Sequence, residues 1–237
     1  DVNNNSDTDS YGSNVNLHYN STFTNNKLYS PTERNDNIAV WVDSDNTTIE
    51  YNTIGGSSGI HGAVGIAMAY NRNSTIRYNN IGGYLANIAL HGIDNNQNYT
   101  FENNNFIGSL SGNQRHVVVY NQGDRTDWHI ENIPYYSQGG HQFGSADEID
   151  LSNNYWGTTN TSDIDDAIQD SEDDETYTVD GYVSYTPINT SASVNAPIQS
   201  PINLTKVVSG SDVILTWDAV TATDLAGYKI YSLDGET

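Results

Sequence analysis

The segments "NTTIEYNTIGG" (46–56) and "NSTIRYNNIGG" (73–83) are two copies of one eleven-residue pattern. In each, an apolar residue stands three positions before an asparagine, and another stands two positions after it. The pattern recurs around Asn26 and Asn104 and, more loosely, around Asn132 and Asn153. The asparagines thus fall at positions 26, 52, 79, 104, 132 and 153, in steps of 26, 27, 25, 28 and 21. A nearly fixed period of this length predicts a repeat architecture rather than a catalytic motif.

A second short pattern alternates with the first. It reads "VNLHY" at 15–19, "IAVWV" at 38–42, "IAMAY" at 66–70, "IALHG" at 88–92 and "VVVY" at 117–120. Each run is rich in β-forming residues and is bounded by Gly, Asn or Asp, which is typical of a strand. Each period therefore holds at least two strands and no helix. The leucine pattern of leucine-rich repeats is absent, and a propeller blade needs a longer period.

These observations predict an all-β fold, a parallel β-helix of about five to six coils, because each coil can lay its strands on those of the coil before. Inward asparagines at the bends can then hydrogen-bond the backbone and one another. We expect one such column to contain Asn26, Asn52, Asn79, Asn104 and Asn153. The Gly-Gly pairs that begin at Gly55 and Gly82 fit sharp bends with a positive φ.

The composition limits the partners of the chain. Its 237 residues include only 8 basic residues against 30 acidic ones, so nucleic acid and anionic membrane surfaces are unsuitable partners. The sequence has no cysteine, which excludes disulfides and thiolate metal sites. No apolar run reaches the length of a membrane span. Residues 1–13 are polar and unlike a signal peptide, so we expect a mature or excised piece of a longer protein.

The segment "NNYWGTTNTSDIDDAIQDSEDDETYTVDGYVSYTPI" (153–188) resembles the closing segment of right-handed parallel β-helix repeat proteins of bacterial and archaeal surfaces. In that family an Asn-Asn-x-Trp-Gly turn precedes a short helix, here expected in "DIDDAIQD", then an acidic loop and a last strand that ends near a proline. The resemblance covers residues 14–188 and implies a right-handed β-helix whose open end is covered by this cap. It is specific for the fold alone, because the fold carries lyases, hydrolases and non-catalytic surface proteins.

Residues 189–200 are rich in Ser, Asn and Pro, which predicts a linker. Residues 201–237 resemble the start of a fibronectin type III domain, with Pro201 before the first strand, Trp217 in "VILTWDAV" and Tyr228 in "LAGYKIY". Such a sandwich needs about 100 residues. We therefore expect only its leading strands here, truncated from a modular parent protein that continues.

The lyases of this fold imply a Lys or Arg base beside calcium-binding carboxylates, and the hydrolases imply a cluster of aspartates. The repeats contain one lysine, Lys27, and the arginines Arg34, Arg72, Arg77, Arg115 and Arg125, which lie in turns or at strand ends. Arg77 aligns with Glu50 and Glu102 in an outward column, where an ion-pair ladder is a simpler explanation than catalysis.

Other candidate groups are weaker. Asp43 and Asp45 form the best pair of carboxylates for hydrolysis, but the next coil adds no third carboxylate to them. His18, His61 and His91 do not have the spacing of a zinc site. Among the sequons for N-glycosylation are those that begin at Asn20, Asn46, Asn73 and Asn98. Several are expected by chance in a chain so rich in Asn, Ser and Thr.

The acidic part of the cap has two interpretations. Carboxylate oxygens suit Ca²⁺, and the candidate ligands are Asp165, Asp166, Asp170, Asp173 and Asp174. Their spacing is not that of an EF-hand, and a solvated acidic loop is the simpler alternative.

The second pattern suggests a ligand site. Aligned by its first apolar residue, it sends Leu17, Val40, Met68, Leu90 and Val119 inward. The next residue then points outward, in a column of His18, Trp41, Ala69, His91 and Tyr120. One hypothesis is that His18, Trp41, His91 and Tyr120 bind a saccharide. The alternative is that a loop covers this face and makes it a secondary core.

Three functions remain open: a non-catalytic stalk, adhesin or matrix module, a polysaccharide lyase or glycoside hydrolase, and a structural subunit of an extracellular polymer. The scarcity of Lys and Asp in shared columns favours the non-catalytic readings. We expect an extracellular or cell-surface location, with polysaccharide, other surface components or further copies of the chain as partners.

Overall fold

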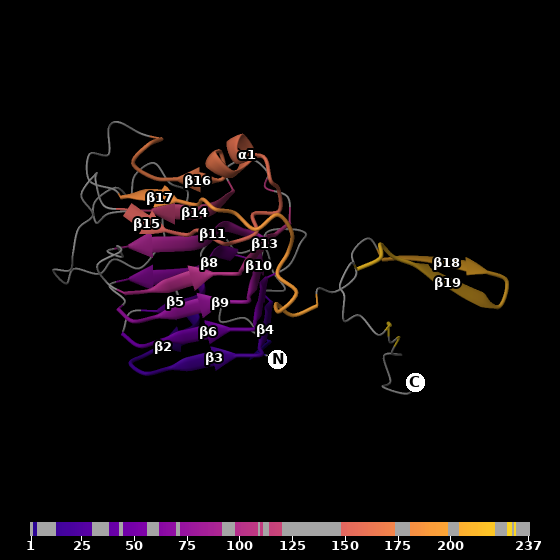
Figure 1. The fold of residues 1–237 in the computed structure, drawn as a ribbon. Coiled ribbons are helices and arrows are strands. Elements are labelled where there is room, and N and C mark those ends of the chain that lie inside the picture. The colour runs from indigo at the N-terminus through magenta and orange to yellow at the C-terminus, as the bar shows by residue number, and fades with distance from the viewer. Residues whose placement is uncertain are drawn as a thin grey trace. The chain divides into compact units, whose positions relative to one another are not determined.

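A computed structural model describes residues 2–3, 13–29, 38–42, 45–55, 62–69, 72–91, 98–108, 110, 114–119, 148–173, 181–198, 204–220, 227–228 and 230. The chain divides into two compact units, Asp1–Pro197 and Ile198–Thr237. The first unit is built from stacked parallel sheets (Figure 1). In the described part of the chain, no helix is long and apolar enough to cross a membrane.

Three parallel sheets make up the stack. The strands of each sheet are given below in the order in which neighbours are hydrogen-bonded, which differs from their order in the chain. Sheet A contains β1 (Val2–Asn3), β4 (Lys27–Tyr29), β7 (Thr53–Gly55), β10 (Asn80–Gly82) and β13 (Asn105–Ile107). Sheet B contains β16 (Ile168–Gln169), β14 (Arg115–Val119), β11 (Tyr84–His91), β8 (Gly62–Ala69), β5 (Ile38–Val42) and β2 (Ser13–Leu17). Sheet C contains β12 (Thr100–Glu102), β9 (Thr75–Arg77), β6 (Thr48–Glu50) and β3 (Thr22–Thr24).

One repeat of the chain passes through sheets B, C and A in that order, as β2, β3 and β4 do. The next repeat begins at β5, which pairs in parallel with β2, and its other strands stack on β3 and β4 in the same way. This all-β arrangement, with stacked parallel sheets and almost no helix, is compatible with a β-helix.

The apolar residues of the eleven-residue pattern form the core. Ile49, Ile76 and Phe101 are paired neighbours at the centre of sheet C, and all three are buried. Ile54 and Ile81 make the corresponding column in sheet A and are fully buried. The three-residue strands of sheet C each bury their central residue, so alternation along a short strand is enough to define the inside of the stack.

The five inward residues that we expected in sheet B do lie in the main core: Leu17, Val40, Met68, Leu90 and Val119. The expected register is wrong for the run at residues 38–42, however. Val40, rather than Ile38, pairs with both Val15 and Ile66. Ala39 and Val40 both belong to the main core, whereas Ile38 and Trp41 belong to a second apolar cluster. The run is thus shifted by two residues, and Val42 takes the place expected for Val40, between Leu17 and Met68.

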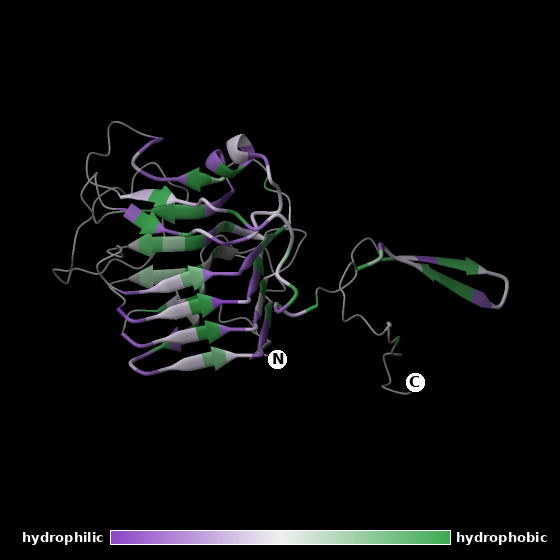
Figure 2. Cartoon of the chain, in the orientation of Figure 1, coloured by the Kyte–Doolittle hydropathy of each residue, from purple (hydrophilic) through white to green (hydrophobic). Residues whose placement is uncertain are grey.

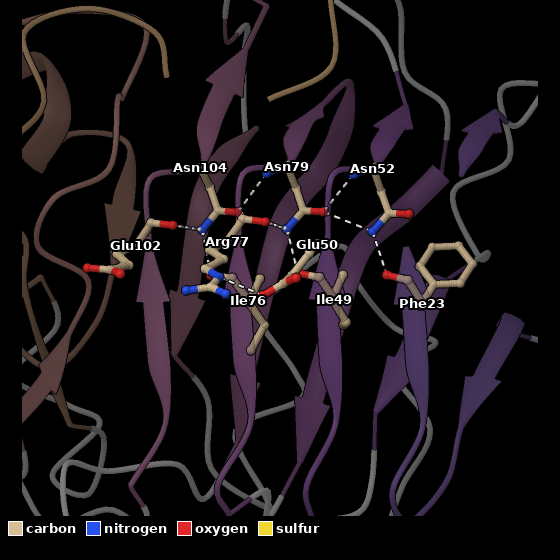
Figure 3. Close-up of polar contacts among 9 residues, drawn as sticks. All are labelled: Phe23, Ile49, Glu50, Asn52, Ile76, Arg77, Asn79, Glu102 and Asn104. Carbon is tan, nitrogen blue, oxygen red and sulfur yellow. Dashed lines mark hydrogen bonds and ion pairs between the residues drawn. The ribbon is translucent and has the colours of Figure 1, made fainter. Parts of the chain in front are cut away.

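A column of asparagines, buried except for the half-buried Asn26, runs along the stack, and its first four members stand one residue before β4, β7, β10 and β13 (Figure 3). We call it the inner column; its members are Asn26, Asn52, Asn79, Asn104 and Asn154. In each step the backbone N–H and the side-chain Nδ2 of one asparagine both donate to Oδ1 of the next. For Asn79 and Asn104 these distances are 3.1 and 2.9 Å.

The inner column corrects one predicted residue. Asn104 donates to Asn154 and not to Asn153. Asn153 instead has a positive φ, of 58°. The residues just before the other members of the column also have a positive φ: Asn25, Tyr51, Tyr78 and Asn103. Asn153 thus belongs to the corner between sheets C and A, one position earlier in the repeat. The glycine prediction is confirmed, because each Gly-Gly pair contains a residue with a positive φ, Gly55 in the first and Gly83 in the second.

The predicted cap region, 153–188, stacks on the last repeat, because Tyr155 bridges Asn105 and β16 pairs with β14. It contains the short α1 (Thr161–Asp165), whose N-cap is Asn160, and β17 (Tyr182–Ser184), which pairs with β15 (Glu148–Asp150) just before the region. The helix therefore begins two residues earlier and ends five residues earlier than the expected "DIDDAIQD" segment. Trp156 is buried and stacks on Phe106 with ring centroids 4.6 Å apart, so the tryptophan of the Asn-Asn-x-Trp-Gly turn joins the cap to the core.

Residues 189–197 of the predicted linker belong to the first unit and contact it. Asn189 Nδ2 donates to the carbonyl oxygen of Asn153 at 2.6 Å, and the Ser193 N–H donates to Asn105 Oδ1 at 2.7 Å. Further along, Asn80 Nδ2 donates to the carbonyl oxygen of Pro197 at 2.5 Å. This segment packs along sheet A of the first unit, so it is part of the folded stack.

The second unit contains an antiparallel hairpin of β18 (Thr205–Ser209) and β19 (Asp212–Thr216), joined by a turn with Gly210 at φ 64°. Its large apolar side chains are exposed: Val207 by 57 % and Val208 by 63 %. These neighbours point to opposite faces of the hairpin, so neither face is packed in the way that the sheets of the stack are.

Candidate functional site

The structure separates the residues of the predicted saccharide column. Trp41 pairs with Ala67, which pairs with Ala89, so Trp41 lies in the column of the small residues. His91 pairs with Ala69, one position after Leu90 in the core column. His18 is exposed and follows the end of β2, and Tyr120 lies outside the described residues. Trp41 is therefore not in one column with the two histidines.

The face that carries Trp41 is buried. Trp41 is 4 % exposed and packs in a cluster with Ile38, Val64, Ala67, Ala86, Ala89 and Val118. A saccharide cannot stack on an indole ring without access to it. The secondary-core alternative describes this face, so Trp41 cannot take the part predicted for it. Of the other predicted members, His18 is exposed, while the side chain of His91 and all of Tyr120 lie outside the described residues.

Two of the candidate calcium ligands, Asp170 and Asp173, accept hydrogen bonds from backbone N–H groups of the cap. Asp170 is 7 % exposed, and its two oxygens accept hydrogen bonds from the backbone N–H groups of Glu172 (2.9 Å) and Val183 (2.6 Å). Asp173 Oδ2 accepts from the backbone N–H of Asp170 at 3.0 Å. These contacts close a turn and attach it to β17. Burial raises the pKa of Asp170 to about 6, and the two backbone hydrogen bonds act against this rise.

The remaining candidates do not complete a metal site in the part of the cap that the structure describes. Asp165 and Asp166 are exposed, and Asp174 lies outside the described residues. Across the described ranges, no three histidine, aspartate or glutamate side chains come close enough to hold a metal ion. Of the carboxylate pair considered for hydrolysis, Asp43 lies outside these ranges and Asp45 Oδ1 accepts from the backbone N–H of Arg72.

A polar pair that sequence reasoning missed lies inside the stack. Asn87 Nδ2 and His116 Nδ1 are 2.7 Å apart, and both residues are buried. The His116 ring also stacks on Phe106, with centroids 4.9 Å apart. Burial lowers the pKa of His116 to about 4, while a hydrogen bond with the Trp156 backbone opposes the lowering. The imidazole is therefore neutral at pH 7 and acts as an acceptor for Asn87.

The outward column with Arg77 contains the expected ion pair. Arg77 Nε lies 2.5 Å from Glu50 Oε1 (Figure 3). Beside it, the Tyr51 and Tyr78 rings stack with centroids 5.2 Å apart, and the guanidinium of Arg77 lies 5.3 Å from the Tyr78 centroid. The Glu50 carboxylate raises the pKa of Arg77 through a hydrogen bond, so the guanidinium stays charged.

A second column of asparagines lies at the corner between sheets B and C. We call it the outer column; its members, two residues before each strand of sheet C, are Asn20, Asn46, Asn73 and Asn98. All four have a positive φ, between 52° and 59°. Asn46 Nδ2 donates to Asn20 Oδ1 at 3.1 Å, and Asn98 Nδ2 donates to Asn73 Oδ1 at 2.8 Å.

The outer column gathers the four sequons that composition alone had suggested were fortuitous. Their positions differ by 26, 27 and 25, which are also the steps of the inner column from Asn26 to Asn104. That coincidence of period was the signal in the sequence that could have identified them as one surface feature.

Comparison of the chain with models of protein families, with curated proteins and with solved structures found no match. The assignment of function therefore depends on the contacts described above.

Proposed function

We propose that this chain is a non-catalytic module of an extracellular or cell-surface protein, a right-handed parallel β-helix that serves as a rigid stalk, adhesin or matrix element. The observation that carries the proposal is the inner column. It is continuous from Asn26 to Asn154, and each member has hydrogen-bonding partners in the neighbouring repeat.

The inner column supports a mechanical role because its bonds hold successive repeats in register. Asn79 Nδ2 donates to the Ile49 carbonyl oxygen of the preceding repeat at 2.9 Å, while its N–H donates to Asn104 in the following repeat. Each repeat is thus tied to both of its neighbours in the stack. In repeat proteins, stability is close to a sum of such nearest-neighbour terms, so a strong interface between repeats favours a stiff rod.

The contacts of the ionisable side chains also support a non-catalytic role. Arg77 pairs with Glu50, the Asp170 carboxylate accepts two backbone N–H groups, and His116 bonds Asn87 within the core. A general acid or base has to reach the substrate atom that it protonates or deprotonates. These three groups are instead used to join repeats or to close the cap.

We infer in addition that the second unit belongs to a fibronectin type III-like module. The antiparallel hairpin and the edge-to-face contact between Trp217 and Tyr228, with centroids 5.1 Å apart, support this assignment. A second sheet would cover the exposed Val207 or Val208 face in such a sandwich.

The test is to incubate the purified protein with acidic and neutral polysaccharides, and to measure both retention on the polymer and the appearance of unsaturated or reducing ends. The proposal predicts no new ends over hours at micromolar protein, with or without Ca²⁺. Catalytic formation of unsaturated ends would instead assign a polysaccharide lyase, and formation of reducing ends alone would assign a glycoside hydrolase. Fractionation of the source cells tests the location separately.

A further inference from the structure

We propose that the outer column is a site of N-glycosylation, and that it carries oligosaccharides on alternate repeats, at Asn20 and Asn73. The inference uses the proposed function only in requiring that the chain is exported. It rests on three observations: the register of the four sequons, their contrast with the neighbouring corner, and the hydrogen bonding of the side-chain amides.

The register brings the complete acceptor sequence into line in every repeat. N-glycosylation requires Asn-x-Ser/Thr in an accessible segment. The hydroxyl residues at the third position are Thr22, Thr48, Thr75 and Thr100, and they pair in register as the first residues of the four strands of sheet C. Asn20, Asn73 and Asn98 are exposed and Asn46 is half-buried, at hydrophilic turns that lead into these strands (Figure 2).

The corner between sheets C and A provides an internal comparison. It has the same left-handed backbone, which favours asparagine, and three of its five residues are asparagines: Asn25, Asn103 and Asn153. The residues two positions later are Lys27, Asn105 and Tyr155, so none of the three is a sequon. The need for asparagine at a left-handed corner therefore does not by itself produce sequons in this chain.

The side-chain amides distinguish alternate members of the outer column. Asn46 and Asn98 each donate Nδ2, the atom that would receive the sugar, to the Oδ1 of the preceding repeat. Within the described residues, Nδ2 of Asn20 and of Asn73 donates no hydrogen bond. Neighbouring repeats are about 4.8 Å apart, which leaves too little room for branched oligosaccharides side by side, whereas Asn20 and Asn73 are two repeats apart.

The reaction requires a lipid-phosphate-linked oligosaccharide and a transferase that recognises the sequon. The bond between sugar C1 and the phosphate oxygen breaks, a bond between C1 and Nδ2 forms, Nδ2 loses one proton, and the lipid phosphate leaves. The asparagine becomes a secondary amide that still has one N–H and its Oδ1. Asn46 and Asn98 can therefore keep donating to the Oδ1 atoms of glycosylated Asn20 and Asn73.

The test uses the protein purified from its source. Its glycans are released enzymatically in H₂¹⁸O, which converts each formerly glycosylated asparagine to an ¹⁸O-labelled aspartate. Peptide mapping by mass spectrometry then locates the label. We expect the label at Asn20 and Asn73, and unmodified peptides at Asn46, Asn98 and Asn189. Asn189 is a matched control, because it begins a sequon outside the column and its Nδ2 is bonded to Asn103 and Asn153.

A variant tests the assignment in a host that N-glycosylates exported proteins. Thr75→Val keeps the branched shape of the strand residue but removes the hydroxyl, and it should abolish the glycan at Asn73 while that at Asn20 remains. Ser191→Ala, in the Asn189 sequon, should change neither, and circular dichroism checks that both variants fold.

The outcomes separate this inference from the proposed function. Four unmodified asparagines in protein recovered from the cell surface or medium would overturn the glycosylation inference and leave the surface role standing. Occupancy of Asn46 or Asn98 would overturn the alternation. Recovery of the protein only from the cytosol would overturn the surface role. If the sequons of that cytosolic protein were also unmodified, the surface role and the glycosylation inference would both be overturned.

Discussion

The inner and outer columns place the same amino acid at nearly the same interval in the same repeats, yet in different environments. Asn79 of the inner column is fully buried, and its side chain bonds Ile49, Arg77 and Asn104 while accepting from Asn52. Asn73 of the outer column is exposed, and its side chain only accepts one bond, from Asn98. A repeated asparagine therefore has no fixed role, and burial decides whether its amide stabilises the fold or faces solvent.

The largest difference should appear when one amide is removed from the inner column. Asn79→Ala leaves the Asn52 N–H and the Ile49 carbonyl without their partner in a buried site. An unsatisfied buried polar group costs about 1–3 kcal/mol, so we expect the free energy of unfolding to fall by about 3 kcal/mol. Denaturant unfolding measures this loss. The matched variant Asn73→Gly keeps the positive φ and should change stability by less than about 0.5 kcal/mol; similar losses in both would contradict the contrast.

A second test concerns the buried pair of Asn87 and His116. The unfolded chain binds a proton at His116 below pH 6.5, but the folded chain binds it only below about pH 4. The neutral histidine thus contributes stability that is present above pH 6.5 and is lost as the pH falls towards 4. Since a tenfold change in proton affinity is worth about 1.4 kcal/mol, the native chain should lose about 2 kcal/mol more than His116→Gln does between pH 7 and 4.5. Parallel pH profiles would show that His116 is not buried in this way.

A smaller effect is expected from the backbone of the outer column. Asn73 has a positive φ of 52°. The left-handed conformation disfavours a residue with a Cβ by about 1 kcal/mol. Asn73→Ala should therefore be about 1 kcal/mol less stable than Asn73→Gly, as measured by denaturant unfolding. Equal stability of the two variants would mean that the corner is not held in the left-handed conformation.

The smallest effect should come from the Arg77–Glu50 pair. It lies on the outside of sheet C, where solvent screens charges, and exposed ion pairs contribute about 0–1 kcal/mol. Arg77→Gln should lower the free energy of unfolding by about 0.5 kcal/mol at low salt, and the difference should shrink at about 1 M NaCl. A salt-independent loss of about 2 kcal/mol would indicate that packing of the arginine on Tyr78 dominates.

The positions that could be predicted from sequence are those with a fixed spacing. Asn26, Asn52, Asn79 and Asn104 lie at intervals of 25 to 27 residues, and the structure stacks all four. Asn153 was misassigned because it is followed by Asn154 and both fit a pattern with shortened spacing. Hydrogen bonds to Asn104 select the second of the two, and spacing alone cannot show this.

The errors in sheet B and at residues 189–197 have a common physical origin. The five residues Ile38–Val42 are all buried, so their hydrophobicity carries no alternation from which to read the register. The segment from Asn189 to Pro197 is polar enough to suggest a linker, yet it packs through hydrogen bonds to asparagines of sheet A. The outer face of sheet B at these residues and the outer face of sheet A are both covered. The composition of a strand does not reveal whether its outer face is covered. The failure of the predicted saccharide site at Trp41 follows from the same cause.

A pair of double-mutant cycles tests the central claim most directly, because the same two repeats contain both an inner pair, Asn79 and Asn104, and an outer pair, Asn73 and Asn98. Each pair is joined by one Nδ2–Oδ1 hydrogen bond, of 2.9 Å in the inner column and 2.8 Å in the outer. Alanine would replace the inner residues and glycine the outer ones. We expect a coupling energy of about 1–2 kcal/mol for the inner pair and of less than about 0.5 kcal/mol for the outer pair. Equal coupling energies, or a larger one for the outer pair, would contradict the distinct roles of the two columns.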